Sequence, residues 1–165
     1  MKISRWLQKD NSNKGSYILF IALPEQQTIT VGGLKTAQFP RGYYAYVGSA
    51  MGGLKSRLSH HLKGSKRPHW HIDYLLTKAS LNGVILCQSQ SKVECIIAQA
   101  LNRQFDCVPG FGASDCQCRS HLFFATDEEQ MKSTIMTILN SLGMQPQLIL
   151  FDDVTLPSAI PHTLL

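Results

Sequence analysis

The sequence predicts an α+β domain with a small antiparallel or mixed central sheet flanked by helices, and three observations lead to this prediction. Two apolar, β-prone runs, 17–23 and 43–47, have the composition of buried core strands. Between them, the alternating residues 28–31 and the glycine pair that follows indicate an inserted hairpin. After them, leucines recur every fourth residue over 54–62, as on one face of a helix. Hairpins favour antiparallel pairing, and the helix needs a sheet face to cover.

The second half of the chain alternates helix-like and strand-like segments. Ser91 and Glu94 have the spacing of a capping box at a helix start. Thr126 and Glu129 have the same spacing. The predicted elements are helices over 69–78, 91–105 and 126–142, and strands over 83–87 and 121–125.

Length and composition indicate one compact domain with short additions. The chain has 165 residues, 44% of them hydrophobic and only 16% charged, so it can build a core and is not of the disordered class. It has no apolar run long enough for a transmembrane helix and no export signal at its start, so we expect a cytoplasmic protein that does not enter membranes. The predicted parts are an N-terminal extension (1–14), a core domain (15–125), and a C-terminal helix with a loosely attached tail (126–165).

Five cysteines without an export signal favour free thiols over disulfides. The segment with Asp115, Cys116, Cys118 and His121 contains zinc-ligand residue types. Its spacing is not that of a standard zinc finger, and a second pair of cysteines is missing, so a structural metal is the minor alternative. A metal- or redox-responsive centre over 107–121 is one of the function hypotheses that remain.

Charge is distributed unevenly. The net charge is +5, and residues 26–72 contain no Asp or Glu. The basic residues of this stretch are Lys35, Arg41, Lys55, Arg57, Lys63, Lys66 and Arg67, together with four histidines. Such a stretch is typical of a surface that meets a phosphate-rich partner. A solvated basic face without a partner is the alternative.

An ordered set of residues resembles a known family. Gly15-Ser16-Tyr17 opens the first predicted strand, and Tyr46-Val47-Gly48 closes the second. Arg57, His61 and Glu94 follow in order, on two predicted helices. The set resembles the GIY-YIG endonucleases, although Ser16 stands where the family name has Ile. The segments 43–50, 69–76 and 112–118 resemble the Uri-type branch of small stand-alone proteins, and the likeness covers residues 15–125.

The resemblance implies a role for each residue of this set. Tyr17 and Tyr46 would line the site and position or deprotonate the attacking water. A free tyrosine has a pKa near 10, so use as a base requires a neighbouring positive charge or metal. Gly48 would let the backbone pass close to the site. Taken singly, the tyrosines are more typical of a strand core than of an active site.

The helix residues would supply the charges. The resemblance implies that Arg57 binds the scissile phosphate with its planar guanidinium. His61 would move protons near neutral pH. Glu94 would hold Mg²⁺ or Mn²⁺, and one carboxylate is enough for such an ion. Alternatively, Arg57 is a solvated helix residue and Glu94 serves only the capping box.

Other residues complete the expected site. His69 and Asp73 would share a helix face, either beside the site or as a capped helix start. The family's late asparagine could correspond to Asn102, Ser120 or His121. The expected nucleic-acid-binding residues are Lys55, Lys63, Lys66, Arg67, His69 and His71.

The sequence therefore predicts a metal-dependent endonuclease that acts on DNA with one divalent ion. RNA stays open as a substrate, and a protein partner could supply specificity. The rival hypothesis is a nucleic-acid-binding module that has no catalysis of its own.

Overall fold

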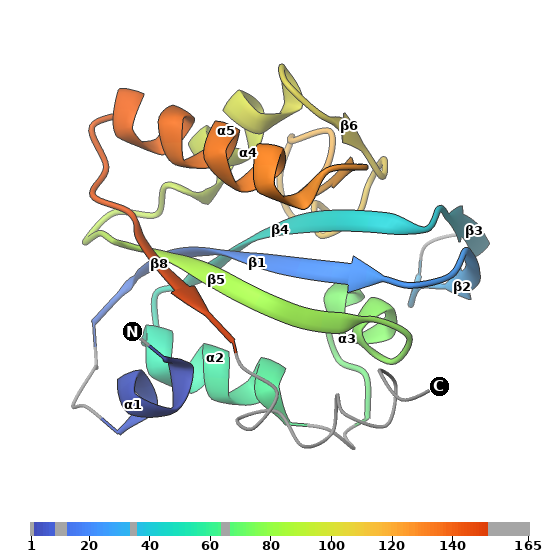
Figure 1. Ribbon diagram of the computed structural model, residues 1–165, viewed down its shortest axis with the longest axis horizontal. Helices are drawn as coiled ribbons and strands as arrows, with labels where there is room; N and C mark the ends of the chain where they lie inside the picture. The colour runs from blue at the N-terminus through green and yellow to red at the C-terminus, as the bar shows by residue number, and fades with distance from the viewer. Residues whose placement is uncertain (1, 9–12, 34–35, 64–66, 152–165) are drawn as a thin grey trace.

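Helices and strands alternate along the chain in the computed structural model, which describes residues 2–8, 13–33, 36–63 and 67–151 (Figure 1). The helices are α1 (Ile3–Leu7), α2 (Leu54–Leu62), α3 (His71–Leu76), α4 (Glu94–Asn102) and α5 (Glu128–Ser141). The strands are β1 (Gly15–Leu23), β2 (Gln27–Thr30), β3 (Thr36–Phe39), β4 (Gly42–Ala50), β5 (Ser80–Gln88), β6 (Asp106–Cys107), β7 (Leu122–Ala125) and β8 (Gln147–Leu150). All the predicted elements occur within this longer series.

The central sheet has six strands in the order β6-β7-β4-β1-β5-β8, and every neighbouring pair is antiparallel. β1 lies between β4 and β5 and pairs with both along almost its whole length. β2 and β3 form a separate hairpin between β1 and β4. The prediction of an α+β domain with a small antiparallel sheet, flanking helices and an inserted hairpin is confirmed.

The side chains of β1 alternate between two hydrophobic cores. Tyr17, Leu19 and Ile21 lie in the core that α1, α2 and α3 cover (Figure 1). Ile18 and Phe20 lie in the opposite core, which α4 and α5 cover. Successive strand residues point to opposite faces of a sheet. A strand covered on both faces is therefore apolar throughout, which explains the continuous run in the sequence.

The ends of the described chain pack onto the domain. Ile3 and Trp6 of α1 are buried in the core below the sheet. β8 pairs with β5, and its Ile149 is also buried. The structure therefore differs from the predicted tail at residues 147–150, because β8 satisfies backbone groups that β5 would otherwise expose at a sheet edge. The rest of that tail, residues 152–165, lies outside the described residues.

Two helices begin at other residues than the capping patterns predict. α4 begins at Glu94 after Val93, without a side-chain cap, so the predicted capping box with Ser91 does not form. α5 begins after Asp127, whose carboxylate accepts the N–H of Gln130 at 3.1 Å. Asp127 thus takes the cap position that the sequence assigned to Thr126. The carboxylate of Glu94 is left available for other contacts.

The longest helix that the structure describes is α5, with 14 residues. A helix needs about 20 residues to span a bilayer. None of the helices in the described part of the chain is long and apolar enough to cross a membrane.

Replacing Trp6 by alanine tests whether α1 belongs to the folded domain. The ring is 4% exposed, so we expect Trp6→Ala to lower the free energy of unfolding by about 3–5 kcal/mol through lost burial and a residual cavity. Denaturant unfolding of the full chain measures this change. Ser4→Ala, at an exposed position of the same helix, is the control and should change stability by less than ~0.5 kcal/mol. Equal stability of the two variants would contradict the packing of α1.

Candidate functional site

The two tyrosines of the expected site lie side by side below the sheet. Tyr17 on β1 and Tyr46 on β4 belong to the same core, and their ring centroids are 6.5 Å apart. Gly48 is the residue paired with Tyr17 across the strands. A Cβ at position 48 would overlap the Tyr17 ring and lie 2.8 Å from its Cε1 atom. Gly48 therefore leaves space for the Tyr17 ring. This is a more specific role than the one expected from the sequence, which was a close approach of the backbone to the site.

His61 connects this pair to α2. Its side chain is buried, and its Nε2 atom lies 2.6 Å from the Tyr17 hydroxyl oxygen, within hydrogen-bond distance. Which of the two atoms carries the proton depends on the tautomer of the imidazole. The His61 ring also lies 6.4 Å from the Tyr46 ring, edge to face. The structure thus brings Tyr17, Tyr46 and His61 together.

Arg57 lies one helical turn before His61 and joins the same group. Its guanidinium lies over the Trp70 ring, 4.2 Å from the ring centroid. The charge of Arg57 and its hydrogen bond to Tyr17 both lower the pKa of that tyrosine. Stacking on Trp70 orients the planar cation while leaving its edge able to bind an anion.

Glu94 reaches the group from the other layer, because α4 covers the opposite face of the sheet (Figure 1). β7 pairs with β4 only as far as Tyr46, and beyond it the Val47 N–H donates to the His121 carbonyl. His121 Nδ1 lies 3.9 Å from Glu94 Oε2. The charge of Glu94 raises the pKa of Tyr46 and of Tyr17, so the carboxylate and both phenols form one electrostatic group.

Burial dominates the electrostatics of the tyrosines. Desolvation raises the pKa of Tyr17 well above its usual value, and the charge of Tyr46 adds to the effect. Desolvation is also the main cause of the raised pKa of Tyr46, followed by the charge of Glu94. Arg57 opposes both shifts without cancelling them. Both hydroxyls are therefore protonated near neutral pH unless a bound cation lowers their pKa.

The His69–Asp73 segment has a structural role. α3 begins at His71, so His69 precedes the helix. The prediction that His69 and Asp73 share a helix face is therefore wrong. The Asp73 carboxylate accepts the N–H groups of His69 and Trp70 at 2.8 and 2.9 Å, and His60 Nε2 lies 3.3 Å away. Asp73 therefore caps α3 and fixes Trp70 beneath Arg57.

The expected nucleic-acid-binding residues surround α2. Lys55 is half-buried on the helix, and Lys63, Arg67 and His69 are exposed after it. His71 is half-buried, and its Nδ1 accepts the Gly112 N–H at 2.8 Å. Lys66 lies outside the described residues. His71 thus supports a neighbouring loop, whereas Lys63, Arg67 and His69 are exposed to solvent after α2.

That loop, residues 108–121, forms a wall of the site that the sequence did not predict. Phe111 is fully buried, and its ring lies 6.2 Å from that of Tyr46 and 5.6 Å from that of His71. Gly112 follows with a φ of +69°, and a Cβ there would be 3.1 Å from Tyr46 Cε1. The sequence marked this loop only through the likeness of residues 112–118 to the Uri-type branch, without assigning it to the site.

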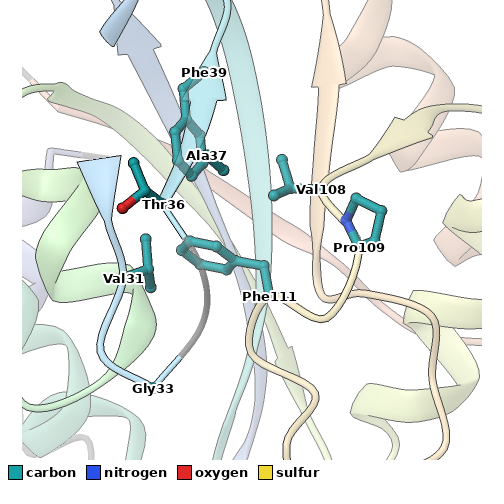
Figure 2. A pocket seen from close by; sticks show the side chains of 8 residues that line it. All are labelled: Val31, Gly33, Thr36, Ala37, Phe39, Val108, Pro109 and Phe111. Atoms are coloured by element: carbon teal, nitrogen blue, oxygen red, sulfur yellow. The ribbon is translucent and has the colours of Figure 1, made fainter. Parts of the chain in front are cut away.

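Phe111 also separates the site from an apolar cavity of about 440 Å³ (Figure 2). The cavity lies between the inserted hairpin and the loop. Its lining residues are Val31, Gly33, Thr36, Ala37, Phe39, Val108, Pro109 and Phe111. The described residues that line it carry no charge.

The candidates for the family's late asparagine differ in position. Asn102 is the exposed last residue of α4, about 12 Å along the helix axis from Glu94. The Ser120 hydroxyl bonds to the backbone of Leu122. Of the three candidates, His121 is the one whose side chain lies beside Glu94.

Residues of two kinds could hold metal ions. Glu94 offers a carboxylate, and its side chain is 13% exposed, with Lys92 Nζ 3.2 Å from Oε1. Three cysteines and a histidine gather beside it: Cys95, Cys116, Cys118 and His121. The zinc interpretation from sequence lacked Cys95, which lies on α4, far from the others along the chain. Asp115, which it included, is not part of this group.

Comparison with known proteins places the chain in a family. No functionally curated protein and no solved structure matches the chain. A family described as "Domain of unknown function DUF123" matches residues 16–144. This range begins in β1 and ends after α5, so it contains the whole candidate site. The chain therefore belongs to the family of the domain of unknown function DUF123.

Proposed function

We propose that this protein is a metal-dependent endonuclease of the GIY-YIG type that hydrolyses a phosphodiester bond in DNA. The observation that carries the proposal is the meeting of Tyr17, Tyr46 and His61 below the sheet. Arg57 stacks on Trp70 next to His61, and Glu94 lies beside His121, whose carbonyl accepts the Val47 N–H of β4. The proposed site residues come from β1, β4, α2 and α4, so their proximity is created by the fold. Separate core or surface roles for these residues would not require them to meet.

Arg57 is the proposed phosphate ligand. Its stacking on Trp70 at 4.2 Å holds the guanidinium plane, and Asp73 in turn holds the backbone of Trp70. A fixed guanidinium can pair with two phosphate oxygens and stabilise the extra charge of the transition state. Arg57 therefore contributes binding and charge stabilisation, and it transfers no proton.

Tyr17 and His61 are the proposed proton-handling pair. Their 2.6 Å contact links a phenol to an imidazole that titrates near neutral pH in its ordinary state. A nucleophilic water bound to the Tyr17 hydroxyl could pass a proton through that hydroxyl to His61 without forming a free phenolate. Tyr46 beside them would orient the water or the phosphate. This assignment agrees with the raised pKa of both tyrosines.

Glu94 is the proposed ligand of Mg²⁺ or Mn²⁺. The carboxylate fits such an ion, since Mg²⁺ is often bound by one or two carboxylates, waters and substrate phosphates. Its partial exposure gives an ion access, and Lys92, 58% exposed, can move away. A bound ion would polarise the phosphate and stabilise developing negative charge. His121 Nδ1, near Oε2, helps to orient the carboxylate.

The basic residues around α2 support a nucleic-acid substrate. Lys63, Arg67 and His69 are exposed after α2, and residues 26–72 carry no acidic side chain. DNA is the proposed substrate, in the cytoplasm, with RNA as the alternative. Specificity would come from the shape of the nucleic acid or from a protein partner.

A nucleic-acid-binding module without catalysis is the second candidate. It is favoured by the ion pair between Lys92 and Glu94, which occupies the carboxylate that would bind the metal. A module of this kind would retain binding and leave the substrate uncut. Cleavage and binding experiments separate the two candidates.

Glu94→Gln and Arg57→Ala should each lower the cleavage rate by about 10²–10³-fold. Arg57→Ala removes a cation that stabilises the transition state, and Glu94→Gln removes the carboxylate that would hold the metal. The assay uses labelled duplex, single-stranded, flap, forked and nicked DNA with Mg²⁺, Mn²⁺ or EDTA. Glu25→Gln and Arg5→Ala make the same chemical changes at exposed positions away from the site and should cleave like the wild type. A normal rate in the site variants would exclude the assigned roles.

Tyr17→Phe should lower cleavage by about 10²–10⁴-fold while keeping the fold, because it removes only the hydroxyl that contacts His61. Tyr44→Phe is the matched control, since Tyr44 is also fully buried and its hydroxyl donates to the Pro40 carbonyl. Single-turnover cleavage rates compare the two variants. An equal loss in both would indicate that packing matters here and the Tyr17 hydroxyl does not.

DNA binding should weaken steeply with salt, and Lys63→Ala or Arg67→Ala should each reduce the slope of log K against log [salt] by about 1. Fluorescence anisotropy over a salt series with EDTA present measures binding without cleavage. Arg103→Ala removes an exposed charge at the end of α4 and should leave the slope unchanged. Affinity that does not depend on salt would rule out phosphate contacts as the driving force.

A further inference from the structure

Cys95, Cys116, Cys118 and His121 form a compact group that the proposed hydrolysis does not use directly. Each offers one ligand atom, and these atoms all lie within 4.8 Å of one another. Cys95 comes from the first turn of α4, and the other three come from the loop before β7. His121 is buried and the cysteines are half-buried, so the group faces little water.

The distances within the group suit a tetrahedral ion. Zinc–sulfur bonds of about 2.3 Å in a tetrahedron place neighbouring ligand atoms about 3.8 Å apart. His121 Nε2 lies 3.5 Å from Cys116 Sγ and 4.0 Å from Cys95 Sγ. The Cys118 Sγ lies 3.9 Å from the Cys95 carbonyl oxygen, which brings it to the same turn of α4. Only small side-chain movements would be needed to close the group around one ion.

The orientation of His121 also fits a metal ligand. Its Nε2 atom faces the sulfur atoms, while its Nδ1 atom faces Glu94 Oε2 at 3.9 Å. Metal-bound histidines commonly direct the second ring nitrogen to a carboxylate or carbonyl, which fixes the ring and its tautomer.

We propose that these four residues bind one structural Zn²⁺. Three thiolates and one imidazole are a known zinc donor set, and soft sulfur ligands disfavour Mg²⁺ and Ca²⁺. Four protein ligands fill a tetrahedron and leave no position for substrate, which is the pattern of structural zinc sites. This site is separate from the Glu94 carboxylate, which would take a hard ion.

The ion would fasten the loop over residues 108–121 to α4. Within the loop, the Gly110 N–H donates to the Arg119 carbonyl and the His121 N–H donates to the Phe111 carbonyl, both at 2.8 Å. These bonds connect the cysteine region to Phe111 and Gly112, which contact Tyr46 and His71. The zinc site therefore fixes the loop that forms one wall of the candidate site. It also fixes His121, which lies beside the Glu94 carboxylate.

The test measures metal content and is independent of any cleavage. The full chain, purified under reducing conditions without chelator, should contain about one zinc per chain by elemental mass spectrometry. Exchange of zinc for Co²⁺ should give the intense visible bands of tetrahedral cobalt and a thiolate charge-transfer band. Removal of the metal by a strong chelator should lower the melting temperature, because binding energy is also folding energy.

Cys118→Ser should lose most of the zinc and the cobalt bands, whereas Cys107→Ser should keep both. Cys107 is the matched control, since it is a half-buried free cysteine of β6 outside the group. The wild-type stoichiometry remains decisive if Cys118→Ser fails to fold. Wild type without zinc or cobalt bands would overturn the proposal, as would equal loss in the control. A disulfide between these cysteines in protein purified without reductant, with no metal uptake after reduction, would assign a redox role to the group instead.

Discussion

The contact between the Tyr17 hydroxyl and His61 Nε2 is the interaction on which the arrangement of the candidate site depends. It joins the central strand of the sheet to α2, and both side chains are buried. The position of the Tyr17 ring requires glycine at position 48, because a larger residue would overlap the ring. The position of His61 also places Arg57, which lies one turn earlier on α2. A buried polar contact of this kind is costly unless both partners are satisfied, so each partner constrains the other.

The candidate site also depends on both faces of the sheet. Tyr17, Tyr46, Arg57 and His61 belong to the layer with α2, while Glu94 belongs to the layer with α4. They meet at β4 beyond the end of its pairing with β7, where His121 lies. The end of this strand pairing thus places His121, and Glu94 beside it, next to β4.

The sequence predicted those parts of the structure that depend on local pattern. The apolar run of β1, the leucine stripe of α2 and the hairpin were recognisable, because periodicity and glycine pairs report local geometry. Tyr17, Tyr46, Arg57 and His61 come together as predicted, and that prediction rested on the resemblance to a family. Cys95 and Phe111 could not be assigned, since their partners are distant in sequence and only tertiary packing brings them together. The starts of α4 after Val93 and of α5 after Asp127 likewise show that the spacing of a capping box does not decide which neighbouring residue takes the N-cap position.

The Tyr17 ring occupies the space that a side chain at position 48 would need, and this restricts the residues that related chains can carry there. A methyl group at Gly52 would meet nothing within 4 Å, whereas one at Gly48 would collide with the phenol. Packing thus forbids substitution at position 48 whether or not any chemistry takes place there. An invariant glycine at this position would be evidence of a buried tyrosine, and it should persist even in relatives that have lost their activity.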